Sequence, residues 1–409
     1  MPLGFEKSSK IVTNSSKIEK HSFLPFITFN IISYKYKYNE KTKKKEKVEK
    51  TRTISYSSHL DGYIYSYYAL TLSKYYEEKL KEKSLRNNVL AFRKLGKSNI
   101  DFAKQAFDDI KTYGDCSVIA LDFSKFFDTL DHRILKEQWA NILNVKTLPN
   151  DHYKIYKSIT KFATVDRDKI YEYFSISKHN PKSKNRKRIC TIEEFREEVR
   201  KKGFIDSNSE KKGIPQGSSL SALLSNIYMI DFDEKIKNYV HTFEGKYYRY
   251  CDDMLIIAPI NRKEEIEKFV IHEISHLNVE INIEKTEKRV FQSINGKLRS
   301  DKPIQYLGFI FDGENIFIRP SSISRYYQKM KKGVLLAKKT RDKKNKIREA
   351  RNIPSEKLYK KKLYTRYSYL GKSNFVSYGI KSKRIMDNST TIKKQTSRLW
   401  GNLLKEIEK

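Results

Sequence analysis

Apolar residues recur every four positions after Ser58 and predict a long amphipathic helix. The repeat runs through Leu60, Ile64, Tyr68, Leu72, Tyr76 and Leu80. This spacing places the six side chains on one face of a helix. Ser58 and Asp61 have the spacing of a capping box, so we expect the helix to begin there. Similar stripes predict helices over 99–110, 218–239 and 266–277, with Asn99 capping the first of them.

Shorter apolar runs bounded by polar residues predict strands. The clearest are 117–122 and 254–258, and others cover 89–97, 279–283 and 306–311. Asp312-Gly313 between two apolar runs predicts a hairpin turn. Near the N-terminus, residues 23–38 read as pairing strands. The Lys/Glu run at 39–52 reads as a solvated loop or the tip of a hairpin.

The charge of the chain indicates its partners. The 409 residues carry a formal net charge of +35 and include 28 tyrosines. Such a surface attracts polyanions, and the interleaved aromatic residues favour nucleic acid over the alternative, a membrane surface. Residues 321–409 hold 26 Lys and Arg against 6 Asp and Glu, a net charge of +20. Leucines, tyrosines and lysines at helical spacing in this segment predict a small helical domain.

The spacing of the cysteines and the lengths of the apolar runs indicate the cellular compartment. Cys116, Cys190 and Cys251 are widely spaced and match neither a disulfide framework nor a metal pattern, as expected in a reducing cytosol. No apolar run approaches the length of a membrane-spanning helix, and no signal peptide is recognisable. We therefore expect a cytoplasmic protein without a membrane partner, with length for two or three domains.

Two adjacent carboxylates, Asp252 and Asp253, lie between an aromatic run and the predicted strand 254–258. The pair falls at a tight turn between two strands. A buried carboxylate is costly unless it is paired or binds a cation, so a divalent metal site is one interpretation and a solvated hairpin turn is the other. Another apolar strand also ends in a carboxylate, Asp122, which favours the metal site.

Four motifs occur in order along the chain. They are the strand ending at Asp122, Gly213-Ile214-Pro215-Gln216-Gly217, Tyr250-Cys251-Asp252-Asp253 and Tyr306-Leu307-Gly308. This ordered set resembles the reverse transcriptase palm, over roughly residues 90–320. The resemblance implies an α+β fold, a right-hand polymerase with fingers and a palm in which an antiparallel sheet packs on helices. It also implies a C-terminal α-helical thumb-like domain.

The resemblance also suggests how the chain is divided. Residues 1–110 would form an N-terminal extension and fingers, 111–134 the first palm strand, 135–212 the rest of the fingers, 213–320 the palm with the Tyr-x-Asp-Asp hairpin and primer grip, and 321–409 the thumb. The thumb assignment depends on position and charge, because a thumb holds a duplex through its phosphates. A basic loop at 179–188 either contacts a nucleic-acid backbone or is solvated charge.

The resemblance implies a metal-dependent catalytic centre. Asp122, Asp252 and Asp253, with the backbone carbonyl of Phe123, would hold two Mg²⁺ ions, with Mn²⁺ as an alternative. Carboxylate and carbonyl oxygens are the ligands that Mg²⁺ prefers. In the family, the metal ions activate the primer 3′ hydroxyl and neutralise the leaving pyrophosphate.

Further residues are assigned by the same resemblance to the incoming dNTP and the primer. The dNTP set is Arg93, Lys97, Phe127, Gln216, Gly217 and Lys285, and the primer-grip set is Tyr306, Leu307 and Gly308. Arg93, Lys97 and Lys285 would meet the triphosphate, and ordinary surface charge is the alternative for each. Phe127 would exclude a 2′ hydroxyl, or else belong to the core. Gln216 and Gly217 would lie near the nascent base pair.

Within the family, the chain looks most like the bacterial defence-associated, abortive-infection type. The features are Ser58-His59-Leu60-Asp61-Gly62 and the long insert before Gly213. This type implies antiphage function with an RNA template or non-coding RNA, a DNA product, and protein-primed or untemplated synthesis. A homo-oligomer or a phage-defence partner protein is also implied. The alternatives are a retron- or group II intron-type enzyme, and a non-catalytic RNA-binding protein that kept the palm.

Overall fold

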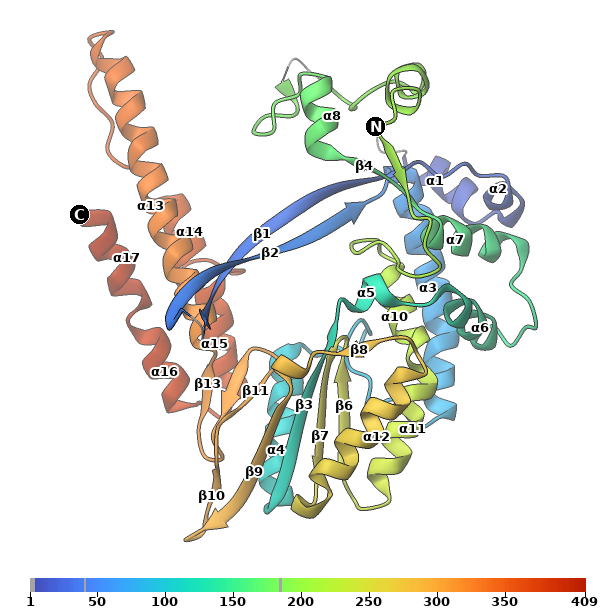
Figure 1. The fold of residues 1–409 in the computed structure, drawn as a ribbon. Helices are drawn as coiled ribbons and strands as arrows, with labels where there is room; N and C mark the ends of the chain where they lie inside the picture. The colour runs from blue at the N-terminus through green and yellow to red at the C-terminus, as the bar shows by residue number, and fades with distance from the viewer. Residues whose placement is uncertain (1–3, 40–41, 184–185) are drawn as a thin grey trace.

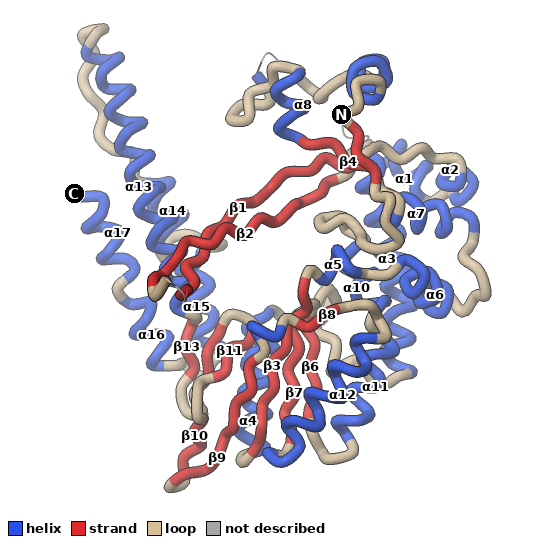
Figure 2. Tube along the Cα trace, viewed as in Figure 1, coloured by secondary structure: helices blue, strands red, loops and turns tan. Residues whose placement is uncertain are grey.

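The computed structural model describes residues 4–39, 42–183 and 186–409. A central sheet carries helices on its faces, a long β-ribbon and a group of helices lie on one side of it, and C-terminal helices lie on the other (Figure 1). Figure 2 shows that the described chain is helical or irregular after residue 318, with no further strand. The α+β class and the helical C-terminal region are therefore confirmed.

The central sheet is antiparallel throughout, with strand order β10-β9-β3-β7-β6, and β8 pairs with the end of β3. Its strands are β3 (Cys116–Ser124), β6 (Lys246–Tyr250), β7 (Asp253–Ala258), β8 (Glu280–Ile281), β9 (Glu287–Ile294) and β10 (Lys297–Ser300). The central position of β3 follows from its composition, because a strand buried on both faces reads as a continuous apolar run.

The sheet is buried on both faces at β3, β6 and β7, because successive residues of these strands enter two different cores. Ile119 and Leu121 join the core formed with α11 (Ile230–His241) and α12 (Lys263–Ser275). Val118 enters the core formed with α4 (Asn99–Tyr113) on the opposite face. The sheet is thereby fixed between two helical layers, and the strand ends that carry the aspartates are held rigidly.

A second sheet, in the order β2-β1-β4-β5, lies beyond one end of the first. It consists of β1 (Phe26–Asn39), β2 (Lys44–Tyr56), β4 (Ala163–Asp166) and β5 (Ile205–Ser207). Helices surround it and join it to the central sheet: α1 (Phe5–Val12), α2 (Ser15–Glu19), α3 (His59–Glu82), α5 (Phe126–Thr129), α6 (His132–Ile142), α7 (Asn150–Thr160), α8 (Arg167–Tyr173), α9 (Ile192–Glu194), a π-helix (Phe195–Arg200) and α10 (Ser221–Tyr228).

The predicted helix after Ser58 is α3, and it organises this region. Its apolar stripe is buried in the main core. Ser58 caps it by accepting a hydrogen bond from the backbone N–H of Asp61. The Asp61 carboxylate does not complete the capping box. It accepts instead from the His21 ring at 2.7 Å and the Leu24 N–H at 3.1 Å, which ties the N-terminal segment to α3.

The C-terminal region begins with a three-stranded sheet, β11 (Ile304–Tyr306), β12 (Phe309–Phe311) and β13 (Ile316–Ile318). Five helices follow: α13 (Pro320–Glu349), α14 (Lys361–Tyr367), α15 (Phe375–Ile385), α16 (Thr390–Ser397) and α17 (Leu399–Glu408). Leu399 and Leu403 of α17 pack against Met330 and Val334 of α13 in a separate small core.

Five element predictions are wrong. Residues 44–52, within the run predicted as a loop or the tip of a hairpin, belong to β2, and a turn at Leu307 and Gly308 interrupts the strand predicted over 306–311. Residues 89–97 form no strand: Val89 makes one isolated bridge to Arg249, and Phe92 has φ of +60°. The helix predicted over 218–239 is divided at Met229 into α10 and α11. The cap of α4 is Ser98, not Asn99, because Ser98 and Asp101 complete a capping box.

Candidate active site at the end of the central sheet

Strand register brings two of the predicted carboxylates together. Asp122 of β3 and Asp253 of β7 are cross-strand partners, so their side chains leave the same region of the sheet at neighbouring positions. Asp252 lies in the turn between β6 and β7, and its carbonyl accepts a hydrogen bond from the Phe123 N–H at 3.2 Å. Asp122 and the adjacent pair Asp252-Asp253, which begins 130 positions later in the sequence, therefore lie at the same end of the sheet.

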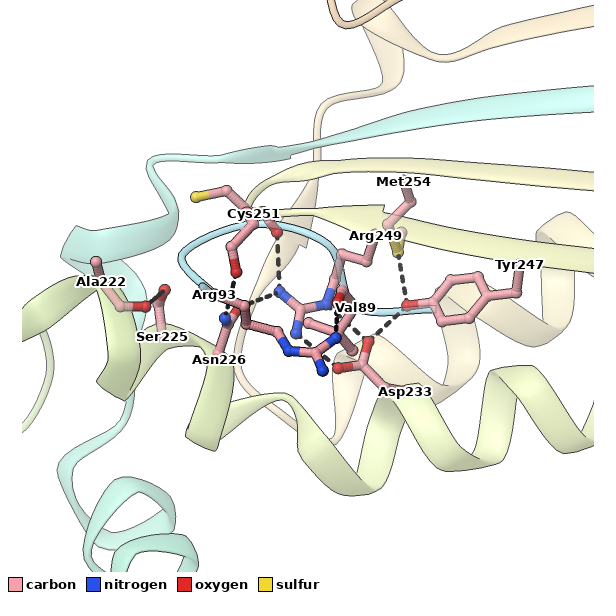
Figure 3. Close-up of polar contacts among 11 residues, drawn as sticks. Val89, Arg93, Ala222, Ser225, Asn226, Asp233, Tyr247, Arg249, Cys251 and Met254 are labelled. Carbon is pink, nitrogen blue, oxygen red and sulfur yellow. Dashed lines mark hydrogen bonds and ion pairs between the residues drawn. The ribbon is translucent and has the colours of Figure 1, made fainter. Parts of the chain in front are cut away.

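The turn that carries Asp252 is held by a buried ion pair (Figure 3). Arg249 and Asp233 are both fully buried, and the guanidinium donates to the carboxylate at 2.7 Å and 2.6 Å. The remaining arm of Arg249 donates to the Cys251 carbonyl at 3.1 Å and to the Asn226 side chain at 3.2 Å. Cys251 has φ of +60°, a left-handed conformation that favours glycine, and the bond to its carbonyl stabilises it there.

The same ion pair also holds the loop before α4. The Asn226 amide donates to the Ala91 carbonyl at 2.9 Å, and the Leu90 N–H donates to the Arg249 carbonyl at 2.9 Å. This buried network joins α10, α11, β6 and the 85–93 loop around the aspartate turn (Figure 3). Sequence reasoning missed it, although a charged residue immediately before Tyr250 within an apolar hairpin was a visible signal.

The carboxylates crowd negative charge into a buried space. Burial, followed by repulsion from Asp252 and Asp122, raises the pKa of Asp253 to about 7. Lys285 and Arg319 oppose this rise. The Lys285 ammonium is ion-paired with Asp122. The Arg319 Nε is buried and has no hydrogen-bond partner among the described residues. Arg319 was not among the predicted site residues.

The donor set fits a hard divalent cation. It consists of oxygen atoms only, burial followed by repulsion from Asp252 and Asp122 raises the pKa of Asp253, and the Lys285 ammonium is ion-paired with Asp122. Carboxylates arranged in this way lower their repulsion by binding Mg²⁺ or Mn²⁺. Among the described residues, the group whose metal-ligating atoms lie within 4.8 Å of one another is His272, Glu273 and His276 at the end of α12, and not the three aspartates. Lys235 pairs with Glu273 there at 2.7 Å.

Phe127 and the Gly213–Gly217 loop lie against each other. The Ile214 N–H donates to the Phe127 carbonyl at 2.9 Å, and the Gly213 N–H donates to the Leu130 carbonyl at 2.8 Å. Phe127 is half-buried, whereas the neighbouring Phe126 is buried in the core. The Gln216 carbonyl accepts from the Ser55 N–H at 2.8 Å, so this loop also contacts the base of the β1–β2 ribbon.

The structure does not bring Arg93 to the carboxylates. Its side chain is 2% exposed and is bound bidentately to Glu77 of α3, at 2.7 Å and 2.6 Å. It also donates to the backbone carbonyls of Arg86 and Val89. Lys97 is exposed in the loop before α4. A triphosphate contact by either residue stays a prediction, and for Arg93 it requires exchange of these internal bonds.

Tyr306, Leu307 and Gly308 form the turn between β11 and β12. Leu307 and Gly308 have φ of +46° and +91°, as a tight turn requires. The Asn99 amide donates to the Leu307 carbonyl at 3.0 Å, and the Arg319 N–H donates to the Gly308 carbonyl at 3.1 Å. Burial, together with the nearby Asp253 charge, raises the pKa of the Tyr306 phenol well above its usual value. The turn therefore adjoins the carboxylate site.

One protein-family model matches the part of the chain that contains these residues. The family model described as Reverse transcriptase (RNA-dependent DNA polymerase) matches residues 42–311. A search of the curated proteins found no match.

Similar solved structures include telomerases. A C-terminally truncated apo telomerase from Candida tropicalis has a TM-score of 0.41 at 15% identity, with 75% of this chain and 58% of that chain covered. The apo telomerase from the same organism has a TM-score of 0.45 at 14% identity, with 98% of this chain and 69% of that chain covered. A telomerase from Candida albicans in complex with a fragment of telomeric RNA has a TM-score of 0.45 at 12% identity. The alignment covers 98% of this chain and 65% of that chain. The chain thus spans less than two thirds of the truncated telomerase.

Proposed function

Because this chain belongs to the reverse transcriptase (RNA-dependent DNA polymerase) family, we propose that it joins dNTPs to a growing DNA 3′ end along an RNA template. Asp122, Asp252 and Asp253 are the proposed catalytic carboxylates. One observation carries this proposal: β3 and β7 pair in the register that sets Asp122 opposite Asp253 at a buried turn.

The same carboxylates, with the Phe123 carbonyl, would hold Mg²⁺ or Mn²⁺. When bound, two such ions supply Lewis-acid stabilisation of the attacking and leaving oxygens in phosphoryl transfer. The protein holds the ligands in place beforehand, since the buried Arg249–Asp233 pair fixes the turn and the sheet fixes Asp122. Preorganisation of this kind keeps the ligands from having to move during the reaction.

Around the carboxylates we assign three further roles. Lys285, which pairs with Asp122 in this structure, would turn to the triphosphate when nucleotide and metal are bound. Phe127 would lie beneath the sugar and exclude a 2′ hydroxyl. Gln216 and Gly217 would border the nascent base pair, and the turn at Tyr306–Gly308 would support the primer end.

Primer extension with an RNA template, a DNA primer, dNTPs and Mg²⁺ tests this function. Wild-type protein should extend the primer, and Asp252→Asn should lose at least about a hundredfold in rate, because one electrostatic contact at a transition state is worth that much. Asp206→Asn, the same change on exposed β5, is the matched control and should keep full activity. Equal extension by wild type and Asp252→Asn would refute the assignment.

The biological setting is a separate proposal that depends on the sequence resemblance. We propose bacterial antiphage defence with an associated RNA, and synthesis that is protein-primed or untemplated. Plaque assays on cells with wild-type protein or Asp252→Asn test it: protection by wild type alone supports a defence role. Sequencing of co-purified nucleic acid tests the alternatives, since a covalent RNA–DNA hybrid would indicate a retron and a structured intron would indicate a maturase.

A further inference from the structure

The β1–β2 ribbon is far longer than its attachment to the rest of the sheet. The two strands pair from Ile27↔Tyr56 to Asn39↔Lys44, thirteen residue pairs that span about 40 Å. The only other strand paired with the ribbon, within the described chain, is β4, and it reaches residues 26–28 alone. Most of the ribbon therefore stands free of the sheet. In Figure 1 it extends from the side of α3 and α7 toward the C-terminal helices.

The free part of the ribbon exposes large apolar side chains. Ile31, Ile32, Tyr34, Tyr38 and Val48 are 40–60% exposed. Because Ile31 and Ile32 are adjacent in a strand, they lie on opposite faces, so neither face is covered. A two-stranded ribbon in water is marginally stable by itself, and clustered exposed apolar residues mark an interaction surface.

The charge of the ribbon identifies the kind of partner. Residues 26–56 contain 9 Lys and Arg and 3 Asp and Glu, a net charge of +6. Lys47 lies over the Tyr34 ring, with its ammonium 3.8 Å from the ring centroid. Alternation of cations with exposed tyrosines suits a polyanion with stacked bases, namely nucleic acid. A second copy of this chain, with a net charge of +35, would be repelled by it.

The near end of the ribbon is fixed to the loop that we place beside the nascent base pair. The Ser55 N–H donates to the Gln216 carbonyl at 2.8 Å. Gly217 has φ of +122°, and a Cβ there would lie 2.4 Å from the Ser55 carbonyl oxygen. Glycine is therefore required for this close approach. The ribbon begins at the proposed nucleotide site and leads away from it.

We propose that the β1–β2 ribbon is an arm that lies along the template–product duplex and holds it against the C-terminal helices. Lys43, Lys47, Lys50 and Arg52 contact phosphates, and Tyr34 and Tyr38 pack on the exposed sugar and base edges. This inference rests on the proposed function, because the duplex is the product of that synthesis. The arm would keep the enzyme on its product between successive additions.

A charge-reversal variant of the arm tests the proposal. Lys43, Lys47 and Lys50 are all exposed on β2 or the preceding turn, and the triple Lys→Glu variant changes the charge by six. The matched control reverses Lys136, Lys146 and Lys268, exposed residues on or near α6 and α12. Equilibrium binding of a fluorescent RNA–DNA hybrid is measured against salt concentration. The arm variant should reduce the salt slope by about 2 to 3 relative to the control.

A second variant changes no charge. Tyr34→Ala with Tyr38→Ala should weaken hybrid binding at least about tenfold, with the salt slope unchanged, because contacts to sugars and base edges release no counterions. Both positions are exposed, so the fold should be retained, and circular dichroism checks this.

The possible outcomes distinguish failure of the arm proposal from failure of the proposed function. If both arm variants bind the hybrid like their controls, the arm proposal is overturned whether or not the protein synthesises DNA. If wild type binds the hybrid through the arm but does not extend a primer, the proposed function fails and the arm stands. If light scattering shows that the tyrosine variant turns a dimer into a monomer without a change in hybrid binding, the ribbon is a self-association surface and the proposal is wrong.

Discussion

At the scale of single residues, the proposed catalytic residue Asp253 has a cost to stability. Its pKa of about 7 lies above that of an unfolded aspartate, so the folded state holds the proton more tightly. Metal-free protein should therefore lose stability as pH rises from about 4 to about 7, by at most about 4 kcal/mol. Thermal unfolding in EDTA from pH 5 to pH 8 measures this loss.

Two controls belong to this measurement. Mg²⁺ should restore stability most strongly at pH 8, where Asp253 is ionised and can bind the cation. Asp253→Asn cannot ionise at this position, so its melting temperature should depend less on pH while activity is lost. An identical pH slope in wild type and Asp253→Asn would contradict the pKa assignment.

Phe127 offers a prediction about the sugar. Its side chain is half-buried beside the Gly213–Gly217 loop, so removal of the ring opens space at the nucleotide site. Phe127→Ala should lower the preference for dNTPs over ribonucleotides by on the order of tenfold or more, because steric exclusion is lost. Competitive incorporation measures the ratio. Phe126→Leu, in the buried core, should lower stability and leave the ratio unchanged.

At the scale of elements, the sequence was most informative where apolar spacing was long and regular. The repeat from Leu60 to Leu80 predicts α3 correctly, and the apolar run before Asp122 predicts β3. Residues 89–97 have the composition of a strand, yet their hydrogen bonds go to Arg249 and Asn226, which lie far away in sequence. Nothing local distinguishes such a loop from a strand.

In the candidate site, too, features visible in the local sequence could be predicted and contacts between distant segments could not. The pairing of the strand that ends near Asp122 with the strand after Asp252 could be expected because the motif order is readable in sequence, and the catalytic role of the three carboxylates stays a prediction. The Arg249–Asp233 pair and Arg319 could not be predicted, since each acts through a contact between distant elements. The free length of the β1–β2 ribbon was also unpredicted, because the Lys/Glu run carries no signal for pairing with residues before it.

The buried ion pair between β6 and α11 gives a prediction at this scale. Asp233→Ala leaves the Arg249 guanidinium buried without its partner, which should lower the free energy of unfolding by about 3–5 kcal/mol. The double variant Asp233→Leu with Arg249→Met should recover much of that stability, because apolar replacement of a buried pair is often neutral. Urea unfolding measures both.

Catalysis should not recover with the fold. The double variant lacks the hydrogen bond from Arg249 to the Cys251 carbonyl, so the left-handed turn before Asp252 loses its support. We expect the rate constant of nucleotide addition to fall and the Mg²⁺ concentration for half-maximal rate to rise. A stable double variant with wild-type Mg²⁺ dependence would show that the pair contributes to stability alone.

At the scale of the whole molecule, the C-terminal helices stabilise the fold, in addition to any role that they have in binding nucleic acid. Met386 and Ile392 are buried in the core beneath the central sheet. Gln395 exchanges two hydrogen bonds with the backbone of Ile318, at 2.8 Å and 3.0 Å. Deletion of residues 321–409 would therefore uncover the palm core, and reduced binding by a truncated chain would not identify a thumb. The described part of the chain contains no helix long and apolar enough to cross a membrane.

Charge removal on α13 tests the thumb assignment without damage to the core. Lys339, Lys343 and Lys346 are exposed at intervals of four and three, so they lie on one face of the helix. The buried residues of α13 are Tyr326, Met330 and Val334, which lie nearer its start. If this face contacts phosphates, the triple Lys→Ala variant should weaken hybrid binding at every sequence and lower the salt slope by about 2 to 3. Lys→Ala changes at Lys136, Lys146 and Lys268 are the control for net charge. Because those residues are remote from the C-terminal helices, an equal loss in both variants would mean that binding responds to total charge, and the thumb assignment would fail.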